Sequence, residues 1–217
     1  MRCVTTLLLA CSLVTNPAVA QHRDRGKDIS RSMRGVLGIE LNRDSLASVI
    51  ARLGKTESWS TGDAGEARVW WCYRTTSGGD SATLLISSDG EMGGPGSEVD
   101  EIRLIRSPYA DSVTSHCGRA RGNAVTANGL RLGVKPREAG RVIGKHAAVD
   151  GDSAAYHWSI RRFLSPKERG YGYWNERRKV CFEGKPPYQD IASRVVIWFD
   201  ERGAYKILLA RYDGAIC

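Results

Sequence analysis

The first helix predicted by the pattern of apolar and polar residues lies in the first quarter of the chain. Leu46, Val49, Ile50 and Leu53 fall at positions i, i+3, i+4 and i+7, so these apolar side chains share one helical face. Gly54 suits the left-handed conformation that ends a helix. The candidate N-cap residues are Asn42 and Asp44.

A second short helix is predicted by the same kind of pattern in the later half of the chain. Pro136 stands where a proline is tolerated in a first helical turn, and Ala139, Val142 and Ile143 form the apolar face. Gly144 again marks the end of the helix. Helices of only two to three turns are not stable alone, so both are expected to pack on a sheet.

Strand-like segments follow each predicted helix, and turn residues separate some of them. In the first half these segments are 68–73, 82–87 and 100–105; in the second they are 155–160, 178–182, 194–199 and 204–210. The turn signals are Asp89-Gly90 and Arg202-Gly203. The sequence therefore predicts an α+β protein with antiparallel strands.

The two halves of the chain resemble each other. Gly38-Ile-Glu-Leu41 precedes the first helix and Gly129-Leu-Arg-Leu132 the second, and each helix ends in a Gly-Lys pair. The matching order is helix, strand, strand, turn and strand. We therefore expect two tandem related units, each a short helix or helix pair packed on an antiparallel sheet of three or four strands.

These patterns divide the chain into segments with different expected roles. We expect a signal peptide at 1–20, a flexible N-terminal tail at 21–35, a first unit at 36–117, a linker at 118–128, and a second unit at 129–217 with an inserted hairpin near 161–178.

The N-terminal segment has the features of a secretory signal. Arg2 precedes an apolar stretch, and Ala18-Val19-Ala20 has the small-x-small pattern of a cleavage site, with cleavage expected after Ala20. The apolar stretch is too short to span a bilayer. This signal predicts that the protein is secreted or periplasmic. The alternative is a lipoprotein anchored at Cys11.

Four cysteines remain after such cleavage, namely Cys72, Cys117, Cys181 and Cys217. An even set in an oxidising compartment indicates disulfides, and four cysteines allow three pairings. No two of them have the short spacing of a zinc knuckle. If each half is one unit, the pairs are Cys72–Cys117 and Cys181–Cys217.

The pattern of a Gly-apolar-x-Leu motif, a short capped helix, Gly-Lys and antiparallel strands resembles a helix-on-sheet module of bacterial envelope proteins. The families with this module are the SmpA/OmlA (BamE) lipoprotein domain and the beta-lactamase inhibitory proteins, and the likeness covers about residues 36–217. This resemblance implies a role in protein binding or inhibition rather than catalysis, with a structural role in outer-membrane assembly as an alternative.

Candidate catalytic residues are few. Gly79-Asp80-Ser81 and Gly151-Asp152-Ser153 resemble short motifs of some serine hydrolases, but both precede strands, where these residues make turns. The four histidines lack a metal-binding spacing. We expect no enzyme activity, no cofactor and no metal; the alternative is a hydrolase of envelope material with Ser81 or Ser153 as nucleophile.

Two regions are candidates for contact with a partner. Trp70 and Trp71 are adjacent on a predicted strand, so their side chains point to opposite faces of the sheet. One of them therefore lies on the face that no helix covers, where it can contact a partner. If the two units pack against each other, both tryptophans are buried instead. The other region is the inserted segment, whose basic residues alternate with aromatic ones. Its candidate binding residues are Tyr171, Tyr173, Trp174, Arg177 and Arg178.

The composition narrows the class of partner. The chain has 217 residues, 41% of them hydrophobic, and a formal net charge of +8. A basic surface favours anionic partners, and for an exported protein nucleic acid is the least natural of these. No transmembrane segment is expected after signal removal. The sequence thus predicts an exported, non-catalytic module that binds another protein or an anionic envelope component.

Overall fold

The chain is a mixed α+β protein built mainly from antiparallel strands, as the sequence predicts. The structure is a computed structural model that describes residues 24–25, 28–62, 67–89, 96–108, 116–144, 147–163 and 188–216. The helical elements are a 3-10 helix η1 (Arg31–Met33), α1 (Leu46–Leu53) and α2 (Pro136–Ile143). The strands are β1 (Asp24–Arg25), β2 (Gly35–Val36), β3 (Ile39–Glu40), β4 (Ser58–Thr61), β5 (Arg68–Ser77), β6 (Asp80–Asp89), β7 (Glu101–Arg106), β8 (Gly118–Asn123), β9 (Ala148–Asp150), β10 (Ser153–Phe163), β11 (Tyr188–Asp200) and β12 (Gly203–Ile216).

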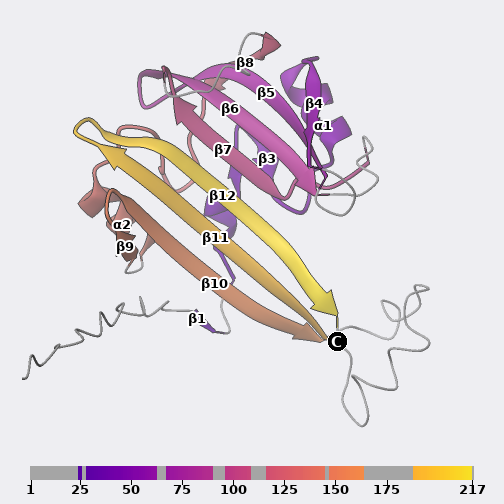
Figure 1. The fold of residues 1–217 in the computed structure, drawn as a ribbon, viewed down its shortest axis with the longest axis vertical. Helices are drawn as coiled ribbons and strands as arrows, with labels where there is room; N and C mark the ends of the chain where they lie inside the picture. The colour runs from indigo at the N-terminus through magenta and orange to yellow at the C-terminus, as the bar shows by residue number, and fades with distance from the viewer. Residues whose placement is uncertain are drawn as a thin grey trace, which may run out of the picture.

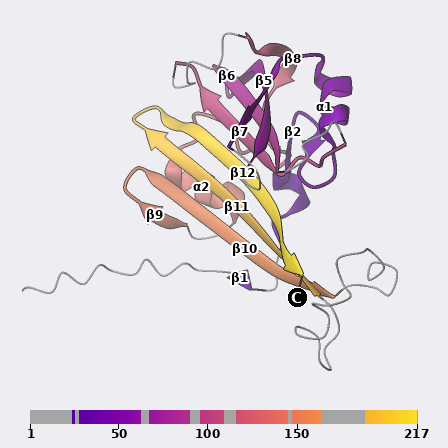
Figure 2. The same cartoon turned by 45° about the vertical axis from the view of Figure 1, so that its right-hand side comes forward.

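Among the described residues, ten of these strands form one large sheet that contains both halves of the chain (Figure 1). The order is β1-β10-β11-β12-β7-β6-β5-β4, with β8 beside β5 and β9 beside β10. All pairs are antiparallel except β1–β10 and β5–β8. The halves meet where β7 pairs with β12. In Figure 1 both α1 and α2 lie behind the strands, and side chains of both helices belong to one core cluster, so they cover the same face of the sheet. Figure 2 shows α2 behind the long strands of the second half and α1 beside the strands of the first half.

Helix α1 begins and ends where local sequence signals require. The side chain of Ser45, rather than Asn42 or Asp44, caps it by accepting a hydrogen bond from the backbone nitrogen of Ser48 at 3.3 Å. Asp44 instead accepts a hydrogen bond from the backbone nitrogen of Glu40 at 2.7 Å, which holds the preceding turn. Gly54 follows the last helical residue. The helix is therefore where its apolar period predicts, with a neighbouring residue as its cap.

Helix α2 has the proline at its start and the glycine after its end that the sequence predicts. Pro136 occupies the first turn, and Gly144 adopts the left-handed conformation with φ of 69°. Ala139 and Ile143 are buried against the sheet, while Val142 is partly buried. Both predicted helices are confirmed in position.

A single hydrophobic core lies between the helices and one face of the large sheet, which we call the core face. The strand register places one row of side chains across both halves of this face, and all of them are buried: Tyr73, Leu84, Leu104, Ile207, Ile197 and Ala154. Tyr73 also donates a hydrogen bond from its hydroxyl to the carbonyl of Gly54 at 3.0 Å, which ties α1 to β5. Burial raises the pKa of Tyr73 to about 12.

A buried arginine joins the two halves at one end of the shared sheet. Arg106 at the end of β7 is 1% exposed, and its guanidinium donates to both carboxylate oxygens of Asp200, at 3.1 and 2.8 Å. It also donates to the carbonyl of Ala204 at 2.9 Å and lies 2.9 Å from Asp80. The arginine thus links β6 and β7 to the β11–β12 turn.

The last eight residues of the flexible tail predicted at 21–35 are part of the folded structure. Ile29 and Met33 are buried in the core, and Asp28 pairs with Arg34 at 2.7 Å and with Arg211 of β12 at 3.2 Å. Asp28 is thus paired both with a near neighbour in sequence and with a strand close to the far end of the chain. Residues 28–35 therefore belong to the folded body.

The segment expected to be a linker includes a strand. Residues 118–123 form β8, which pairs in parallel with β5. The predicted Cys72–Cys117 disulfide is present immediately before β8. Thr56 supports it, since its hydroxyl donates to the carbonyl of Cys72 and accepts from the backbone nitrogen of Gly118, both at 2.8 Å. The disulfide and Thr56 thus attach this segment to the sheet.

The strands of the second half are longer than predicted. Strands β10, β11 and β12 contain 11, 13 and 14 residues. The Arg202-Gly203 turn lies between β11 and β12, as its residues indicate. Gly203 has φ of 105°, and a β-carbon there would collide with the carbonyl of Gly133, so glycine is required. The predicted strand 178–182 lies outside the described residues.

Candidate functional site

The face of the large sheet opposite the helices carries a row of cationic and aromatic side chains, and we call it the open face. Along each strand, alternate side chains point to opposite faces, so Trp71 belongs to the core face and Trp70 to the open face. The strand register assigns these further residues to the open face: Trp59, Arg68, Glu101, Arg103, Arg194, Val196, Trp198, Lys206 and Tyr212.

The two predicted contact tryptophans do point to opposite faces, yet both are buried. Trp70 is 5% exposed because other side chains cover its ring. Trp59 stacks on it with ring centroids 6.4 Å apart, and the guanidinium of Arg103 lies 4.4 Å from its ring centroid. Its Nε1 donates to the hydroxyl of Thr61 at 2.9 Å. A partner would therefore meet Arg103 on this face rather than a bare tryptophan.

Beside Trp70, a buried carboxylate holds several arginines in place. Glu101 is 2% exposed, Nε of Arg103 donates to it, and Arg68 and Arg194 lie 3.7 and 4.0 Å away. The hydroxyl of Tyr212 donates to the same carboxylate at 3.0 Å. A buried charge requires such partners, and here they come from strands of both halves. The side chains at the centre of the open face are thus fixed by mutual contacts.

The ring of Tyr212 lies within cation–π distance of two of these arginines. The guanidinium carbon of Arg68 is 5.7 Å from its centroid and that of Arg194 is 5.5 Å away. Nη2 of Arg194 also donates to the Tyr212 hydroxyl at 3.1 Å. Burial raises the pKa of Tyr212, and the nearby Glu101 carboxylate raises it further, while the two arginines oppose this effect. The phenol therefore stays protonated as a donor to Glu101.

Another cation lies close to an aromatic ring in the second half of the chain. The ammonium of Lys206 lies 4.5 Å from the ring centroid of Trp198 on the neighbouring strand. Partly exposed apolar side chains, Leu85 and Val196, belong to the same face. The open face thus presents cations within cation–π distance of aromatic rings, together with partly exposed apolar side chains. Such a surface can form charge-assisted hydrogen bonds and bury apolar area at once.

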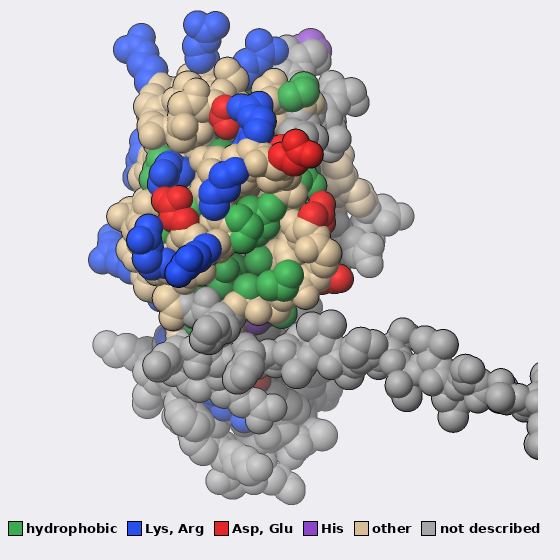
Figure 3. Space-filling model, turned by 90° about the vertical axis from the view of Figure 1, so that its left-hand side faces the viewer, with side chains coloured by type: hydrophobic (Ala, Val, Ile, Leu, Met, Phe, Trp, Pro, Cys, Tyr) green, Lys and Arg blue, Asp and Glu red, His purple; other side chains and the backbone are tan. Residues whose placement is uncertain are grey.

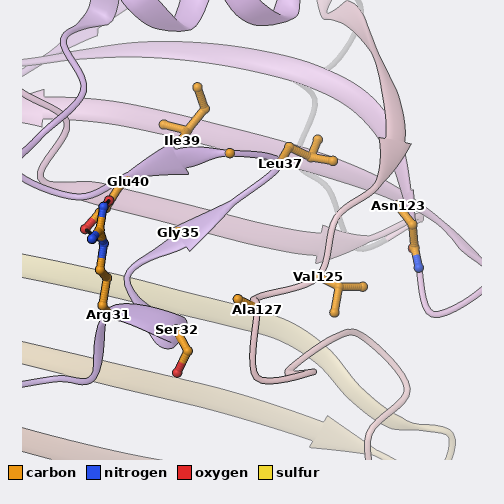
Figure 4. Close-up of a pocket in the computed structure, with 10 residues that line it drawn as sticks. Arg31, Ser32, Gly35, Leu37, Ile39, Glu40, Asn123, Val125 and Ala127 are labelled. Carbon is orange, nitrogen blue, oxygen red and sulfur yellow. Dashed lines mark hydrogen bonds and ion pairs between the residues drawn. The ribbon is translucent and has the colours of Figure 1, made fainter.

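A groove on the other side of the sheet is a second concave feature. It has a volume of about 550 Å³ and lies between the β2–β3 hairpin and the segment after β8 (Figure 4). Leu37, whose φ of 53° is rare for a bulky residue, points from the hairpin tip toward β8, where its Cδ2 would lie 3.2 Å from a β-carbon at Gly122. Arg31 and Glu40 pair across the other end at 3.4 Å. The groove is lined by polar and apolar side chains in similar measure, and we centre the candidate site on the open face, where charged and aromatic side chains contact one another.

The residues considered for catalysis take part in turns. Ser81 follows the β5–β6 turn, in which Gly78 and Gly79 have φ of 60° and 92°. Ser153 follows the turn between β9 and β10, and its hydroxyl donates to the carbonyl of Asp150 at 2.9 Å. His116 is exposed and lies 3.5 Å from Glu57. Both serines therefore stand in the turn context that their neighbours predict.

Several predicted residues lie outside the part of the chain that the structure describes. These are the signal segment with Cys11, most of the inserted segment, the second cysteine pair Cys181 and Cys217, and the candidate binding residues Tyr171, Tyr173, Trp174, Arg177 and Arg178. Their roles stay predictions.

Most residues of the open face are not among the contact residues that the sequence predicts. Arg194, Val196 and Trp198 alternate along one strand, and this spacing indicates a common face. The contact between Arg103 and Trp70 could not be inferred in the same way, because it depends on which strands become neighbours. Local alternation could therefore have found half of the surface.

Within the described ranges, no helix is long and apolar enough to cross a membrane, and no cluster of three or more metal-ligating side chains occurs. Comparison of the chain with protein-family models, with curated proteins and with solved structures finds no match.

Proposed function

We propose that this chain is an exported, non-catalytic binding protein that acts, in the manner of an inhibitor, by contact between its open face and another protein. The observation that supports this most is the row of cations stacked on aromatic rings, from Arg103 on Trp70 to Lys206 on Trp198. It crosses strands from both halves of the chain, so the folded sheet assembles it.

The composition and rigidity of this surface suit protein recognition. Arginine, tryptophan and tyrosine carry a large share of the binding energy at protein interfaces. The buried Glu101 and the ring of Tyr212 hold Arg68 and Arg194 in place before any partner arrives. Side chains that are already ordered lose less conformational entropy on binding, which favours affinity.

Export is supported by the disulfide as well as by the N-terminal sequence. Disulfides such as Cys72–Cys117 persist in oxidising compartments, which include the periplasm and the extracellular space. N-terminal sequencing of the exported protein tests the cleavage site, with Gln21 as the expected first residue. A lipid-modified chain that begins at Cys11 would instead identify a lipoprotein.

The tandem-unit hypothesis explains how one surface is built from both halves. In each half a short helix is followed by a meander of four antiparallel strands, β4 to β7 and β9 to β12, and the last strands of the two meanders pair. This equivalent order supports duplication of one unit. Non-reducing peptide mapping tests it further, because the hypothesis requires a Cys181–Cys217 bridge.

Affinity capture from the exported protein fraction tests the proposed function. The purified mature chain is immobilised in three forms: the original sequence, a double variant Arg103→Ala with Trp198→Ala, and a double variant Trp174→Ala with Arg177→Ala. We expect a discrete partner to bind the original chain and to be lost with the first double variant, which removes two stacked pairs.

The second double variant distinguishes the open face from the inserted segment. If the partner is lost only with Trp174→Ala and Arg177→Ala, the binding surface is the inserted segment instead. If both double variants retain every bound protein, the proposed contact function is wrong. Unfolding midpoints of all three proteins are compared first, so that loss of binding is not confused with loss of folding.

A further inference from the structure

The partly exposed guanidinium groups of Arg103 and Arg194 on the open face indicate which chemistry the partner brings. On the proposed function, which this step assumes, we infer that the partner presents carboxylates flanked by apolar side chains, as on an acidic protein surface. The site itself contains such a contact, because the carboxylate of Glu101 pairs with the guanidinium groups of Arg68, Arg103 and Arg194.

Among the described side chains, three arginines at the centre of the site surround the carboxylate of Glu101. Arg68 pairs with Asp100 at 3.3 Å and shares Glu101 with Arg103 and Arg194. The side chains of Arg103 and Arg194 remain 31% and 41% exposed, so one edge of each stays open to solvent. An incoming carboxylate could pair with the exposed part of either guanidinium.

The arginines are restrained by contacts within the site before a carboxylate binds. A guanidinium is planar, and two of its N–H groups can bind both oxygens of a carboxylate. Arg103 is fixed against the ring of Trp70 and Arg194 against the ring of Tyr212. Because the planes are fixed, an acidic side chain can bind without reordering them.

The neighbouring side chains favour an acidic protein over a dense polyanion. Glu101 lowers the local positive potential, which weakens attraction for a polymer whose charges are closely spaced. Val196, Leu85 and Trp198 give the surface partly exposed apolar area that only a mixed partner can bury. On the side of the molecule shown in Figure 3, basic and acidic side chains are likewise interspersed around apolar ones.

Selection of displayed random peptides on the immobilised, disulfide-intact mature chain tests this inference. We expect enrichment of peptides in which Asp or Glu stands next to aromatic or aliphatic residues. A chosen peptide should bind about tenfold more weakly to the double variant Arg194→Glu with Lys206→Glu, and more weakly to all forms at high salt. Both altered residues are partly exposed, and Arg194→Lys provides a milder second variant that keeps the charge.

Arg137→Glu is the matched control, since it makes the same change of charge on α2, behind the sheet, where the side chain is exposed. It should leave peptide binding unchanged. Polyphosphate and phosphatidylglycerol vesicles are tested in parallel, and tighter binding of either than of the acidic peptides would overturn the inference.

The two failures can be told apart. The selected peptides could lack acidic enrichment and still bind the Arg194→Glu, Lys206→Glu variant more weakly. That result would contradict an acidic partner but would leave the open face as the contact surface. Peptides whose binding no open-face variant changes would contradict the proposed function itself.

Discussion

The two faces of the large sheet use the same strands and the same kinds of side chain for different purposes. On the core face, Trp71 and Tyr73 are packed among aliphatic residues beneath the helices. On the open face, Trp70 and Tyr212 are packed against arginines. Because alternate residues of one strand point to opposite faces, this division follows from the order of residues along each strand.

The comparison shows that burial has two different causes here. Trp71 is buried because apolar neighbours exclude water, whereas Trp70 is buried because Trp59 and Arg103 lie over its ring. The first kind of burial stabilises the fold through the hydrophobic effect. The second leaves a charged layer facing outward, so changes on the two faces should differ in their consequences for stability and binding.

The largest effect on stability is expected from the covalent link between β5 and the segment before β8. Replacing both partners, Cys72→Ala with Cys117→Ala, should lower the free energy of unfolding by about 4 kcal/mol, because the bridge closes a sequence separation of 45 residues. Urea unfolding of the variant and of the original chain measures this. The control is both proteins after full reduction, which opens every disulfide and should make their free energies of unfolding equal; a loss below about 1 kcal/mol in the oxidised variant would contradict the expectation.

Two adjacent leucines on β6 point to opposite faces of the sheet, so their replacement compares the contributions of the two faces to stability. Leu84→Ala removes a fully buried side chain from the core face and should cost about 3 kcal/mol, whereas Leu85→Ala on the open face should cost less than about 1 kcal/mol. Urea unfolding midpoints with matched m-values test the difference. Equal losses from the two variants would show that the assignment of faces is wrong.

The buried arginine at the junction of the halves should matter almost as much. Arg106→Ala leaves Asp80 and Asp200 without their shared cation, at an expected cost of about 2 to 3 kcal/mol. Arg202→Ala is the control, because Arg202 contacts the same Asp80 but is 65% exposed; its loss should cost under about 1 kcal/mol. Thermal unfolding measures the loss of stability in both variants. Similar losses would show that Arg106 contributes no more to stability than the exposed Arg202.

Stability should fall in alkaline solution because of a phenol on the core face. Tyr73 is neutral in the folded protein, and burial raises its pKa from 10.0 to about 12. Its contribution is therefore complete below pH 10 and is lost as the pH rises through the folded pKa, by up to about 2 kcal/mol. Urea unfolding across this range should show a shallower decline for Tyr73→Phe than for the original chain.

Tyr205→Phe, in a partly exposed position on β12, is the matched control for this pH dependence. It should decline with pH as the original chain does. If Tyr73→Phe declines just as steeply, the alkaline loss comes from other groups.

The smallest effect on stability, with a large effect on binding, is expected on the open face. Arg103→Ala removes a partly exposed ion pair and a cation–π contact, so it should cost under about 1 kcal/mol of stability. Calorimetric unfolding measures stability, and titration with the captured partner measures affinity, which should fall about tenfold. A variant that loses stability but binds normally would reverse the roles assigned to the two faces.

The parts of the fold that local sequence determines were predictable. Helices α1 and α2 follow from apolar residues at helical spacing and from Gly54 and Gly144 after their last residues. The Cys72–Cys117 pair followed from treating each half as a unit. These features depend on residues close in sequence or on a simple rule for pairing cysteines.

The remaining features depend on contacts between distant segments. Asp28 looked like part of a solvated tail because its partner Arg211 lies far along the chain. Strand β8 has no apolar period, and it is held by Thr56 and the disulfide. The open face arises only when β7 pairs with β12, which brings Glu101 beside Tyr212. No pattern within a single segment encodes that pairing.

Site-specific photo-crosslinking in the producing cell tests the role of the open face most directly. A photoreactive benzoylphenylalanine replaces Val196 on the open face in one protein and Arg137 on α2 in another. We expect one discrete adduct from position 196 that becomes weaker with Arg103→Ala, as an affinity about tenfold lower requires, and no adduct from position 137. An adduct from position 137 alone, or none from position 196, would contradict the open face as the contact surface.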